Sequence, residues 1–332
     1  MEDLLPFEKV KREIFVKKES ETNWAYGQDP NKRKVEELIK YGVINLNKPS
    51  GPTSHQVSDY VQKILNINKA GHSGTLDPGV TGVLPIALEK ATRIVQTLLT
   101  AGKEYFGLMH LHKKIEDDLI YKTAEEFVGK IKQLPPIRSA VKRQLRTREI
   151  YYLKILEISE KDVLFKIGSE AGFYVRKFCH DFGLKLKTNA HMSELVRTKA
   201  GPFTDKTWVT LHDLKDAYTL YKKNEDEEYI RKIILPIEKA VEHLPRIWVH
   251  DSAVSTLCHG ADLSIPGINK YNNFNENEVV AVMTLKDELI CLGNSLINSS
   301  EIANNDKGKA VKINKVFMER SLYPKNLYMV KE

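Results

Sequence analysis

Cysteine is scarce in this chain, and the three that occur, Cys179, Cys258 and Cys291, lie far apart. They form neither a disulfide framework nor a CxxC metal pair, which is typical of a protein from a reducing compartment. No apolar run approaches the ~18–20 residues that a membrane-spanning helix needs, which excludes that class. The first ten residues carry three acidic side chains where a secretory signal would be basic and then apolar. We therefore expect an intracellular, cytoplasmic protein.

Extremes of composition are also missing. Of the 332 residues, 42% are hydrophobic and 29% are charged, so the chain can bury enough apolar surface to offset the entropy lost on folding. The length suits about two domains. The net charge of +7 matters only where it is clustered, and Arg138–Arg148 holds five basic residues and no acidic one. Such a segment can neutralise nucleic-acid phosphates, although taken alone it is more typical of a solvated loop.

Local patterns predict a mixture of helices and strands up to about Pro245. Residues 1–40 lack clear periodicity and are expected to form an extension that docks on the rest of the chain. Because the expected strands and helices do not alternate regularly, the pattern favours an α+β class. Helices are expected at 54–65, 89–99, 123–134, 174–187, 212–218 and 227–244, and strands at 42–46, 104–112, 150–158, 163–166 and 206–211.

The pattern changes after Pro245 to short strands separated by turns. Strands are expected at 247–250, 279–285, 289–292 and 310–317, with one brief helix at 252–259. A run of short strands with little helix predicts a small β-barrel-like module appended to the α+β body.

The most informative segment for chemistry is the loop around Asp77. Four glycines lie between Gly71 and Gly82, and Pro78 follows the aspartate, so the sequence specifies an unusual backbone path. Such a loop can approach a ligand closely and present one carboxylate. It contains neither a P-loop nor a dinucleotide-binding fingerprint, so a nucleotide-phosphate site is a poor fit. The alternative is a tight turn in which Asp77 accepts hydrogen bonds from backbone amides, and the residues alone leave both interpretations open.

Several segments together resemble the TruB/dyskerin family of pseudouridine synthases. The loop sequence GHSGTLDPGVTGVLP resembles the catalytic signature of that family, and the other motifs follow in family order across about residues 42–215. The tail from about Pro245, which includes HGADLSIPG, resembles a PUA RNA-binding domain. The remaining matching motifs are NKPSGPTS at 47–54, KEY at 103–105, PPIRSAVKR at 135–143, GFYVR at 172–176 and HMSELVR at 191–197.

The resemblance implies a catalytic trio. Asp77 would be the essential carboxylate, acting either by addition to the uracil ring or by promoting cleavage of the glycosidic bond. Tyr105 would stack on a uracil flipped out of the RNA. Arg176 would hold Asp77 ionised in a buried ion pair, whose breakage from one side would cost about 3–5 kcal/mol. Without the resemblance, Tyr105 would be an ordinary core residue and Arg176 a surface residue on the following helix.

The resemblance also implies supporting residues. Tyr174 and Leu195 would wall the base pocket, although helical periodicity alone makes Leu195 a core residue. The active loop would be supported by Lys48, Gly74, Thr75 and Leu76, with a plain turn lysine as the alternative for Lys48. RNA contacts would come from His72, Lys142, Arg143, Arg146, Arg148 and Gly260.

No cofactor or catalytic metal is implied, because the isomerisation involves neither redox chemistry nor phosphate transfer. One competing interpretation is a metal site at His110 and His112 with Asp117 and Asp118, but a third ligand at fixed spacing is missing. A glycosidase would need a second carboxylate opposite Asp77, and none emerges.

The family implies an architecture and partners. We expect a mixed, mainly antiparallel sheet flanked by helices in a catalytic domain at 41–244, a PUA domain at 245–328, and the extension at 1–40. The extension, the PPIRSAVKR motif and the PUA-like tail favour the guide-dependent branch, and the lack of a lysine-rich tail resembles its archaeal form. Partners would be a box H/ACA guide RNA, substrate ribosomal RNA and tRNA, and small Nop-type, Gar-type and kink-turn-binding ribosomal-type proteins. Uridine 55 of tRNA would be a guide-independent target. A non-catalytic RNA-binding scaffold is the alternative function.

Overall fold

The structure, a computed structural model, describes residues 3–135 and 143–325. Contacts between residues divide the chain into two units, and each contains segments from distant parts of the sequence. The first unit consists of Met1–Lys9, Ile44–Ala87 and Ile94–Ile233, and the second of Val10–Val43, Leu88–Arg93 and Ile234–Glu332. The domain boundaries expected at 41, 245 and 328 stay predictions.

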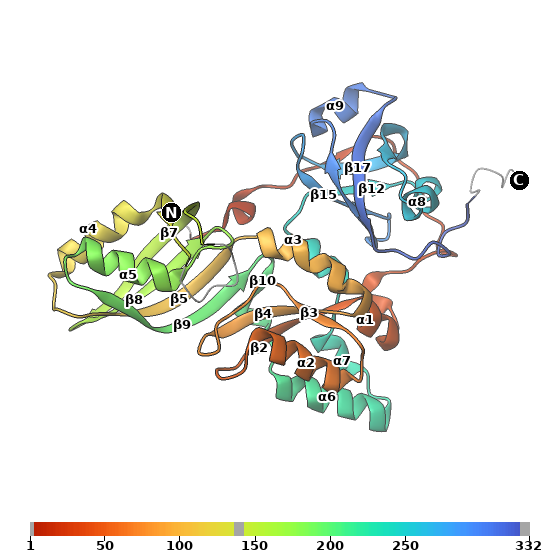
Figure 1. Ribbon diagram of the computed structural model, residues 1–332. Helices are drawn as coiled ribbons and strands as arrows, with labels where there is room; N and C mark the ends of the chain where they lie inside the picture. Colours follow the sequence, from red (N-terminus) through yellow and green to blue (C-terminus); the bar gives the residue numbers. More distant parts are fainter. Residues whose placement is uncertain (1–2, 136–142, 326–332) are drawn as a thin grey trace, which may run out of the picture. The chain divides into compact units, whose positions relative to one another are not determined.

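The first unit is built on one large mixed sheet (Figure 1). Its strands follow the order β2-β4-β9-β5-β8-β7-β6, with β3 beside β4 and β10 beside β9. β5 is antiparallel to both β8 and β9, whereas β4 and β9 are parallel. The mainly antiparallel sheet and the α+β class are therefore confirmed. The strands are β2 (Gly42–Lys48), β3 (Ala70–His72), β4 (Thr81–Leu88), β5 (Lys103–Leu111), β6 (Gly129–Gln133), β7 (Arg146–Ser159), β8 (Asp162–Ser169), β9 (Ala190–Ala200) and β10 (Phe203–Thr204).

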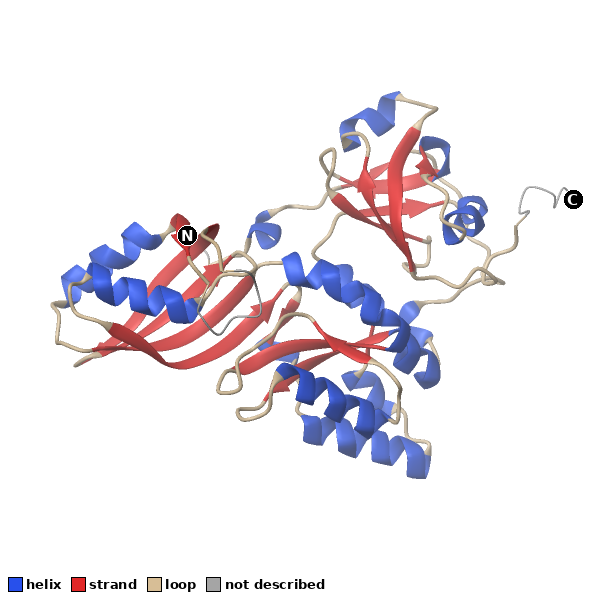
Figure 2. Ribbon diagram, viewed as in Figure 1, coloured by secondary structure: helices blue, strands red, loops and turns tan. Residues whose placement is uncertain are grey.

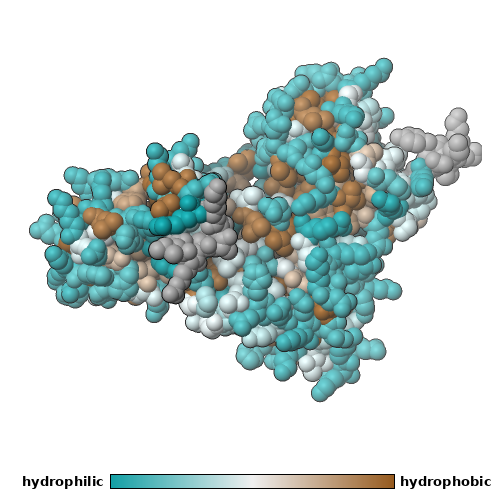
Figure 3. Space-filling view, viewed as in Figure 1, coloured by the Kyte–Doolittle hydropathy of each residue, from teal (hydrophilic) through white to brown (hydrophobic). Residues whose placement is uncertain are grey.

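Helices cover this sheet in two groups. α4 (Asp117–Phe127) and α5 (Val175–Lys185) pack on β7 and β9, and Figure 2 shows them together on one face. α2 (Ser54–Leu65) packs against α6 (Leu211–Asn224), which contacts α7 (Glu228–Ile233). The surface over α6 is mostly hydrophilic in Figure 3, as expected for the outer side of an amphipathic helix. α3 (Val95–Thr100) follows a 3-10 helix at Glu89–Ile94.

Helix α2 begins where the sequence predicts. Thr53 is its N-cap, and its hydroxyl accepts a hydrogen bond from the amide of Gln56. The Gln56 side chain in turn accepts one from the Thr53 amide at 2.8 Å, which completes a capping box. The first turn of α2, with its N-cap five residues after the end of β2, is thereby fixed, and Ser54 in this turn contacts the Asp77 loop at Leu76.

Three predicted elements are wrong in whole or in part. The helix expected at 227–244 is an α-helix only at Glu228–Ile233, and a short strand at Leu235–Pro236 and a 3-10 helix at Ile237–Val241 follow it. The helix expected to open at Thr123 and continue to Leu134 is α4, which begins after Glu116 and ends at Phe127. Gly129 has a φ of 103°, which ends the helical path, so the following residues form β6 instead. The strand expected at 206–211 is also wrong, because a 3-10 helix occupies Asp205–Thr207 and α6 begins at residue 211.

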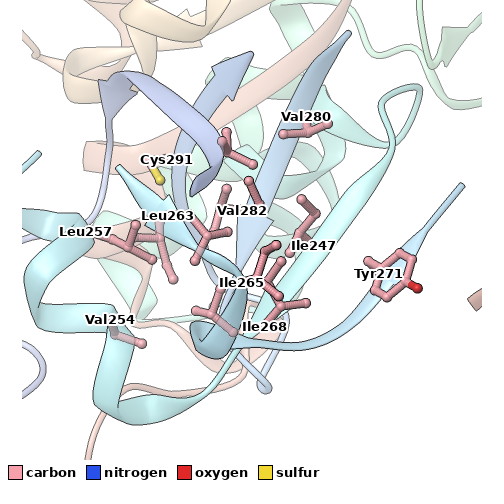
Figure 4. Close-up of a cluster of buried hydrophobic side chains, with 14 of the residues drawn as sticks. Ile247, Val254, Leu257, Leu263, Ile265, Ile268, Tyr271, Val280, Val282 and Cys291 are labelled. Atoms are coloured by element: carbon pink, nitrogen blue, oxygen red, sulfur yellow. The ribbon is translucent and has the colours of Figure 1, made fainter. Parts of the chain in front are cut away.

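The second unit contains a seven-stranded sheet around its own core. Its order is β1-β14-β12-β15-β16-β17-β13. Figure 4 shows Ile247, Val280 and Val282 of the sheet pointing into a cluster with Leu257 of the covering helix. The C-terminal β module is therefore confirmed. Its strands are β1 (Ile14–Val16), β12 (Arg246–Val249), β13 (Leu263–Ser264), β14 (Ile268–Asn272), β15 (Val279–Met283), β16 (Leu289–Ser295) and β17 (Lys309–Val316), and its helices are α1 (Val35–Tyr41), α8 (Asp251–Cys258) and α9 (Ser299–Asn304).

Residues 10–43 belong to this second unit. Strand β1 pairs antiparallel with β14, and β11 (Leu235–Pro236) pairs with Val43 and Gly42. The Arg33 guanidinium donates two hydrogen bonds to the Glu238 carboxylate, both at 2.8 Å. The N-terminal extension is thus ordered by contacts with residues more than 200 positions later, which local periodicity cannot predict.

All three cysteines are buried free thiols. Within the two described stretches of the chain, the helices are too short or too polar to span a membrane.

Candidate active site

The Asp77 loop connects β3 to β4, and Lys48 at the end of β2 supports it from below. The Lys48 side chain is fully buried. Its ammonium group donates hydrogen bonds to the carbonyl oxygens of Pro49 at 2.8 Å, Pro78 at 3.0 Å and Val80 at 2.9 Å. Burial and the nearby positive charge of Arg197 lower the pKa of Lys48. These contacts fix the backbone directly after Asp77.

The first turn of α2 supports the same loop. The Leu76 amide donates a hydrogen bond to the Ser54 hydroxyl at 2.9 Å, and the Leu76 side chain is buried. Gly74 has a φ of 112°, a conformation that side-chain-bearing residues rarely adopt. Thr75 and Asp77 are exposed, so the loop is anchored through its backbone while it presents polar side chains outward.

Asp77 forms an ion pair with Arg176 in the first turn of α5. The structure therefore brings together two members of the predicted trio. The expectation of a buried pair is wrong, because the Asp77 side chain is 53% exposed and that of Arg176 is 52% exposed. Asp77 lies on a projecting bend and Arg176 at a helix end, so solvent reaches both groups. An exposed pair of this kind contributes only about 0–1 kcal/mol to stability.

Tyr105 and Leu195 lie on the face of the sheet that α5 covers. In the antiparallel pairing of β5 with β9, Tyr105 is opposite Arg197 and Gly107 is opposite Leu195. Directly opposite residues point to the same face, so these side chains line one surface. A Cβ on Gly107 would lie 2.4 Å from the ring of Phe165, so glycine is needed there. Tyr105 and Leu195 are each 9% exposed.

Tyr174, the other predicted wall of the base pocket, is the N-cap residue of α5. Its backbone amide donates to the Gln133 side chain at 3.0 Å, and its carbonyl oxygen accepts from the same side chain at 3.2 Å. Gln133 lies at the end of β6, so these two hydrogen bonds fix the start of α5 to the sheet. Arg176 follows two residues later, in the first turn of the helix.

Arg197 is a site residue that the sequence analysis missed. Its side chain is almost completely buried, at 1% exposure. Nε donates to the Val83 carbonyl at 2.7 Å and Nη2 to the Gly74 carbonyl at 3.2 Å. Burial lowers the pKa of Arg197, and the neighbouring phenol of Tyr105 opposes that effect. The burial of Leu195 and Arg197, two residues apart on β9, is visible only in the structure, and β9 was not predicted to be a strand, so the sequence held no local signal for this role.

His72 stands beneath the loop as a neutral imidazole. Its ring meets the edge of His55 at a centroid distance of 4.7 Å. Burial, with smaller effects from His55 and Arg197, lowers the pKa of His72 to about 4. Around pH 7 it therefore carries no charge, which fits a packing or hydrogen-bonding role and not an ionic contact with phosphate.

The predicted RNA-contact arginines lie at the start of β7 or just before it. Arg143 is exposed, and Arg146 opens the strand. Arg148 lies 3.7 Å from the Glu170 carboxylate, so part of its charge is already balanced. Lys142 and most of the PPIRSAVKR motif fall outside the described residues. Gly260 belongs to the other unit, where it follows α8 with a φ of 89°.

The competing metal interpretation gains no support. His110 is paired with Asp162 at 2.7 Å, and His112 lies 3.2 Å from His191. Asp117 and Asp118 form the first turn of α4. In the part of the chain that the structure describes, no group of three or more histidine, cysteine or acidic side chains could hold a metal ion.

Lys103, two residues before Tyr105, is a buried lysine whose titration should make the stability of the protein depend on pH. Its side chain is 5% exposed, and its ammonium donates to the carbonyl oxygens of Leu98 at 3.1 Å and Leu99 at 2.8 Å. Burial, with a smaller effect from Arg197, lowers the pKa of Lys103 to about 7.

The lowered pKa predicts a stability change with pH. Between pH 7 and 8.5 the unfolded chain binds the Lys103 proton and the folded chain releases it, so stability should rise with pH by about 1–2 kcal/mol. Denaturant titrations of wild type and Lys103→Met at both pH values check this, because the contributions of other groups cancel in the difference. An equal pH dependence in the two proteins would show that Lys103 titrates normally.

Four family models match the chain in succession. They are the DKCLD (NUC011) domain at 3–58, the TruB family pseudouridylate synthase N-terminal domain at 62–175, the tRNA pseudouridylate synthase B C-terminal domain at 176–242, and the PUA domain at 245–317.

Named proteins match along nearly the whole chain. "Probable tRNA pseudouridine synthase B" from Thermococcus onnurineus is 56% identical over 95% of this chain and 96% of its own length. The protein of the same name from Pyrococcus furiosus is 56% identical over 95% of this chain and 94% of its own.

Two solved structures share the fold throughout. One is described as a Cbf5-Nop10-Gar1 complex, with a TM-score of 0.93, 56% identity, and coverage of 97% of this chain and 98% of the other. The second is an H/ACA RNP bound to a substrate RNA containing 2'-deoxyuridine, with a TM-score of 0.92, 53% identity, and coverage of 97% and 99%.

Proposed function

The chain belongs to the TruB family of pseudouridylate synthases, and from this membership we propose that it isomerises uridines that a box H/ACA guide RNA selects in ribosomal RNA. We propose uridine 55 of tRNA as a second, guide-independent target. The support is the near-complete match to a protein solved as part of an H/ACA RNP with substrate RNA, together with relatives named for tRNA.

In the proposed reaction, the bond between the uracil base and the ribose moves from N1 of the base to C5. The N1–C1′ bond breaks, the base turns, and C5 bonds to C1′, while the C5 hydrogen leaves as a proton and N1 gains one. Asp77 supplies the carboxylate, either by adding to the ring or by promoting glycosidic cleavage. Tyr105 offers a flat apolar surface on which the flipped uracil stacks, and Leu195 and Tyr174 enclose it. Arg176 orients Asp77.

The observation that carries this proposal is the ion pair between Asp77 and Arg176. The two residues are almost a hundred positions apart, and their contact contributes little to stability because both are half exposed. An RNA-binding scaffold would need no such arrangement. An isomerase needs an ionised carboxylate that is oriented toward the uracil base.

The proposed assembly has protein and RNA partners. We propose a small Nop-type protein, a Gar-type protein and a kink-turn-binding ribosomal-type protein. One solved relative is described as a complex with Nop10 and Gar1, which supports the first two. The kink-turn-binding protein rests on the family resemblance alone.

Guide dependence is tested by assaying two RNAs with the purified protein. A ribosomal RNA fragment should gain pseudouridine only when a complementary H/ACA guide and the partner proteins are added, whereas tRNA should be modified without a guide. Modification of the ribosomal fragment at equal rates with and without guide would contradict the guide-dependent assignment.

The basic segment before β7 should contribute to RNA affinity through phosphate contacts. Replacing Lys142 and Arg143 by alanine should flatten the dependence of log K on log salt by about 1.5, because two phosphate contacts are lost. Lys222→Ala with Lys223→Ala on exposed α6 is the control with the same change of charge. An equal slope in all three proteins would mean that the segment does not contact phosphate.

A further inference from the structure

Arg197 occupies an unusual position for a charged residue. It lies in the middle of the sheet, with β5 on one side of its strand and β4 on the other. Its backbone pairs with Gly82 of β4, which has a φ of 107°. A Cβ at position 82 would lie 2.2 Å from the Arg197 carbonyl oxygen and 2.7 Å from its amide nitrogen. Glycine at position 82 therefore allows the backbones of β4 and β9 to approach each other closely at Arg197.

Stability does not explain a buried arginine at this position. Its hydrogen-bond partners are the backbone carbonyl oxygens of Val83 and Gly74. Among the residues that the structure describes, no carboxylate forms an ion pair with it. It also lowers the pKa values of the buried lysines Lys48 and Lys103 by repulsion, in addition to the effect of burial. A buried charge without a counter-charge is costly, and an apolar side chain of similar volume would fill the site more favourably.

The contacts of Arg197 connect the parts of the site that must act together. Nη2 holds the Gly74 carbonyl, three residues before Asp77, while Lys48 holds the carbonyls of Pro78 and Val80 just after it. The Asp77 loop is therefore clamped on both sides. Tyr105 is the cross-strand neighbour of Arg197 in the pairing of β5 with β9, and its phenol is close enough to oppose the lowering of the Arg197 pKa by burial.

We infer that Arg197 is a positioning residue for the isomerisation, because its buried guanidinium holds the Asp77 loop at the residue of β9 that pairs with Tyr105. This inference rests on the proposed function of the site. Its effect is geometric: a uracil stacked on Tyr105 is held at a fixed distance from the Asp77 carboxylate, and small misplacements of reacting groups lower rates strongly. The role requires the planar fork of arginine, since an ammonium is a single point donor.

The test compares Arg197→Met, Arg197→Lys and Tyr105→Phe with the double variant Arg197→Met/Tyr105→Phe. Single-turnover pseudouridine formation should fall about 50- to 100-fold in Arg197→Met, with the RNA Kd within threefold of wild type. Arg197→Lys should recover less than a tenth of the lost rate. The double variant should be no more than threefold slower than its slower parent, because both changes affect the same pair of cross-strand neighbours. Lys286→Met, which removes a buried lysine of the second unit, is the control for the loss of a buried basic side chain, and its rate should stay within threefold of wild type.

Hydrogen exchange at residues 73–80 provides a readout that does not require activity. The loop amides should exchange at least tenfold faster in Arg197→Met and Arg197→Lys, and at the wild-type rate in Lys286→Met. If Arg197→Met does not fold, Arg197→Lys carries the comparison. Unchanged exchange, or rate losses that simply multiply in the double variant, would overturn the inference. Failure of the wild-type protein to form pseudouridine would instead refute the proposed function, while the exchange result would still decide whether Arg197 clamps the loop.

Discussion

Asp77→Asn should abolish pseudouridine formation, with a loss of at least ~10³-fold in the single-turnover rate. The amide has nearly the same volume as the carboxylate but cannot act as an anionic nucleophile or base. The loop itself should be unaffected, because its anchors are the backbone contacts with Lys48, Ser54 and Arg197. RNA affinity should therefore remain within about twofold of wild type.

The control for this change is Asp216→Asn on the exposed face of α6. It makes the same change of charge at a residue far from the Asp77 loop in sequence, and it should leave the rate unchanged. Substantial residual turnover in Asp77→Asn, in a preparation free of wild-type protein, would refute the role assigned to the carboxylate. A large loss of RNA affinity would show that Asp77 acts in binding and not in the chemical step.

Arg176→Met should give the second-largest effect, with a rate loss of about 10²-fold. Removing the guanidinium leaves the Asp77 carboxylate without its partner, so its orientation is no longer fixed. Because both side chains are half exposed, the free energy of unfolding should change by no more than about 1 kcal/mol. A rate assay and a thermal unfolding curve of the same preparation separate the two effects.

Lys177→Met is the matched control, because Lys177 is the next residue of α5 and forms an ion pair with Asp181. Its loss should not change the rate. If Arg176→Met retained activity within threefold of wild type, the pair would have no catalytic importance. If it lost several kcal/mol of stability, the pair would behave as the buried pair expected from sequence.

The parts of the fold that the sequence predicts correctly are those with local signals. Thr53 and Gln56 define the start of α2 within four residues, and the alternation in β5 places Tyr105 on a strand. Strand β4 was missed because its residues from Gly82 to Leu88 are all buried, so no polar alternation marks it. Strand β9 was missed because its pattern is interrupted by two irregularities in its pairing with β5.

The same distinction applies to the site. Asp77 could be predicted because glycines specify its loop locally, and Arg176 because it is the last residue of the family motif GFYVR. Arg197 has no local signal of function, since its importance comes from contacts with Val83 and Gly74, more than a hundred residues away in sequence. The exposure of the Asp77–Arg176 pair was also outside the reach of sequence, because it depends on how far the loop projects from the sheet.

The most direct test of the central claim is the release of tritium from RNA labelled at C5 of uridine. Formation of the C5–C1′ bond expels that hydrogen, whereas binding or base flipping alone does not. We expect about one tritium released to water for each pseudouridine formed at a uridine paired with its guide, and none with Asp77→Asn. Tight RNA binding by the wild-type protein and its partners, without any tritium release, would contradict the account and identify the chain as a scaffold.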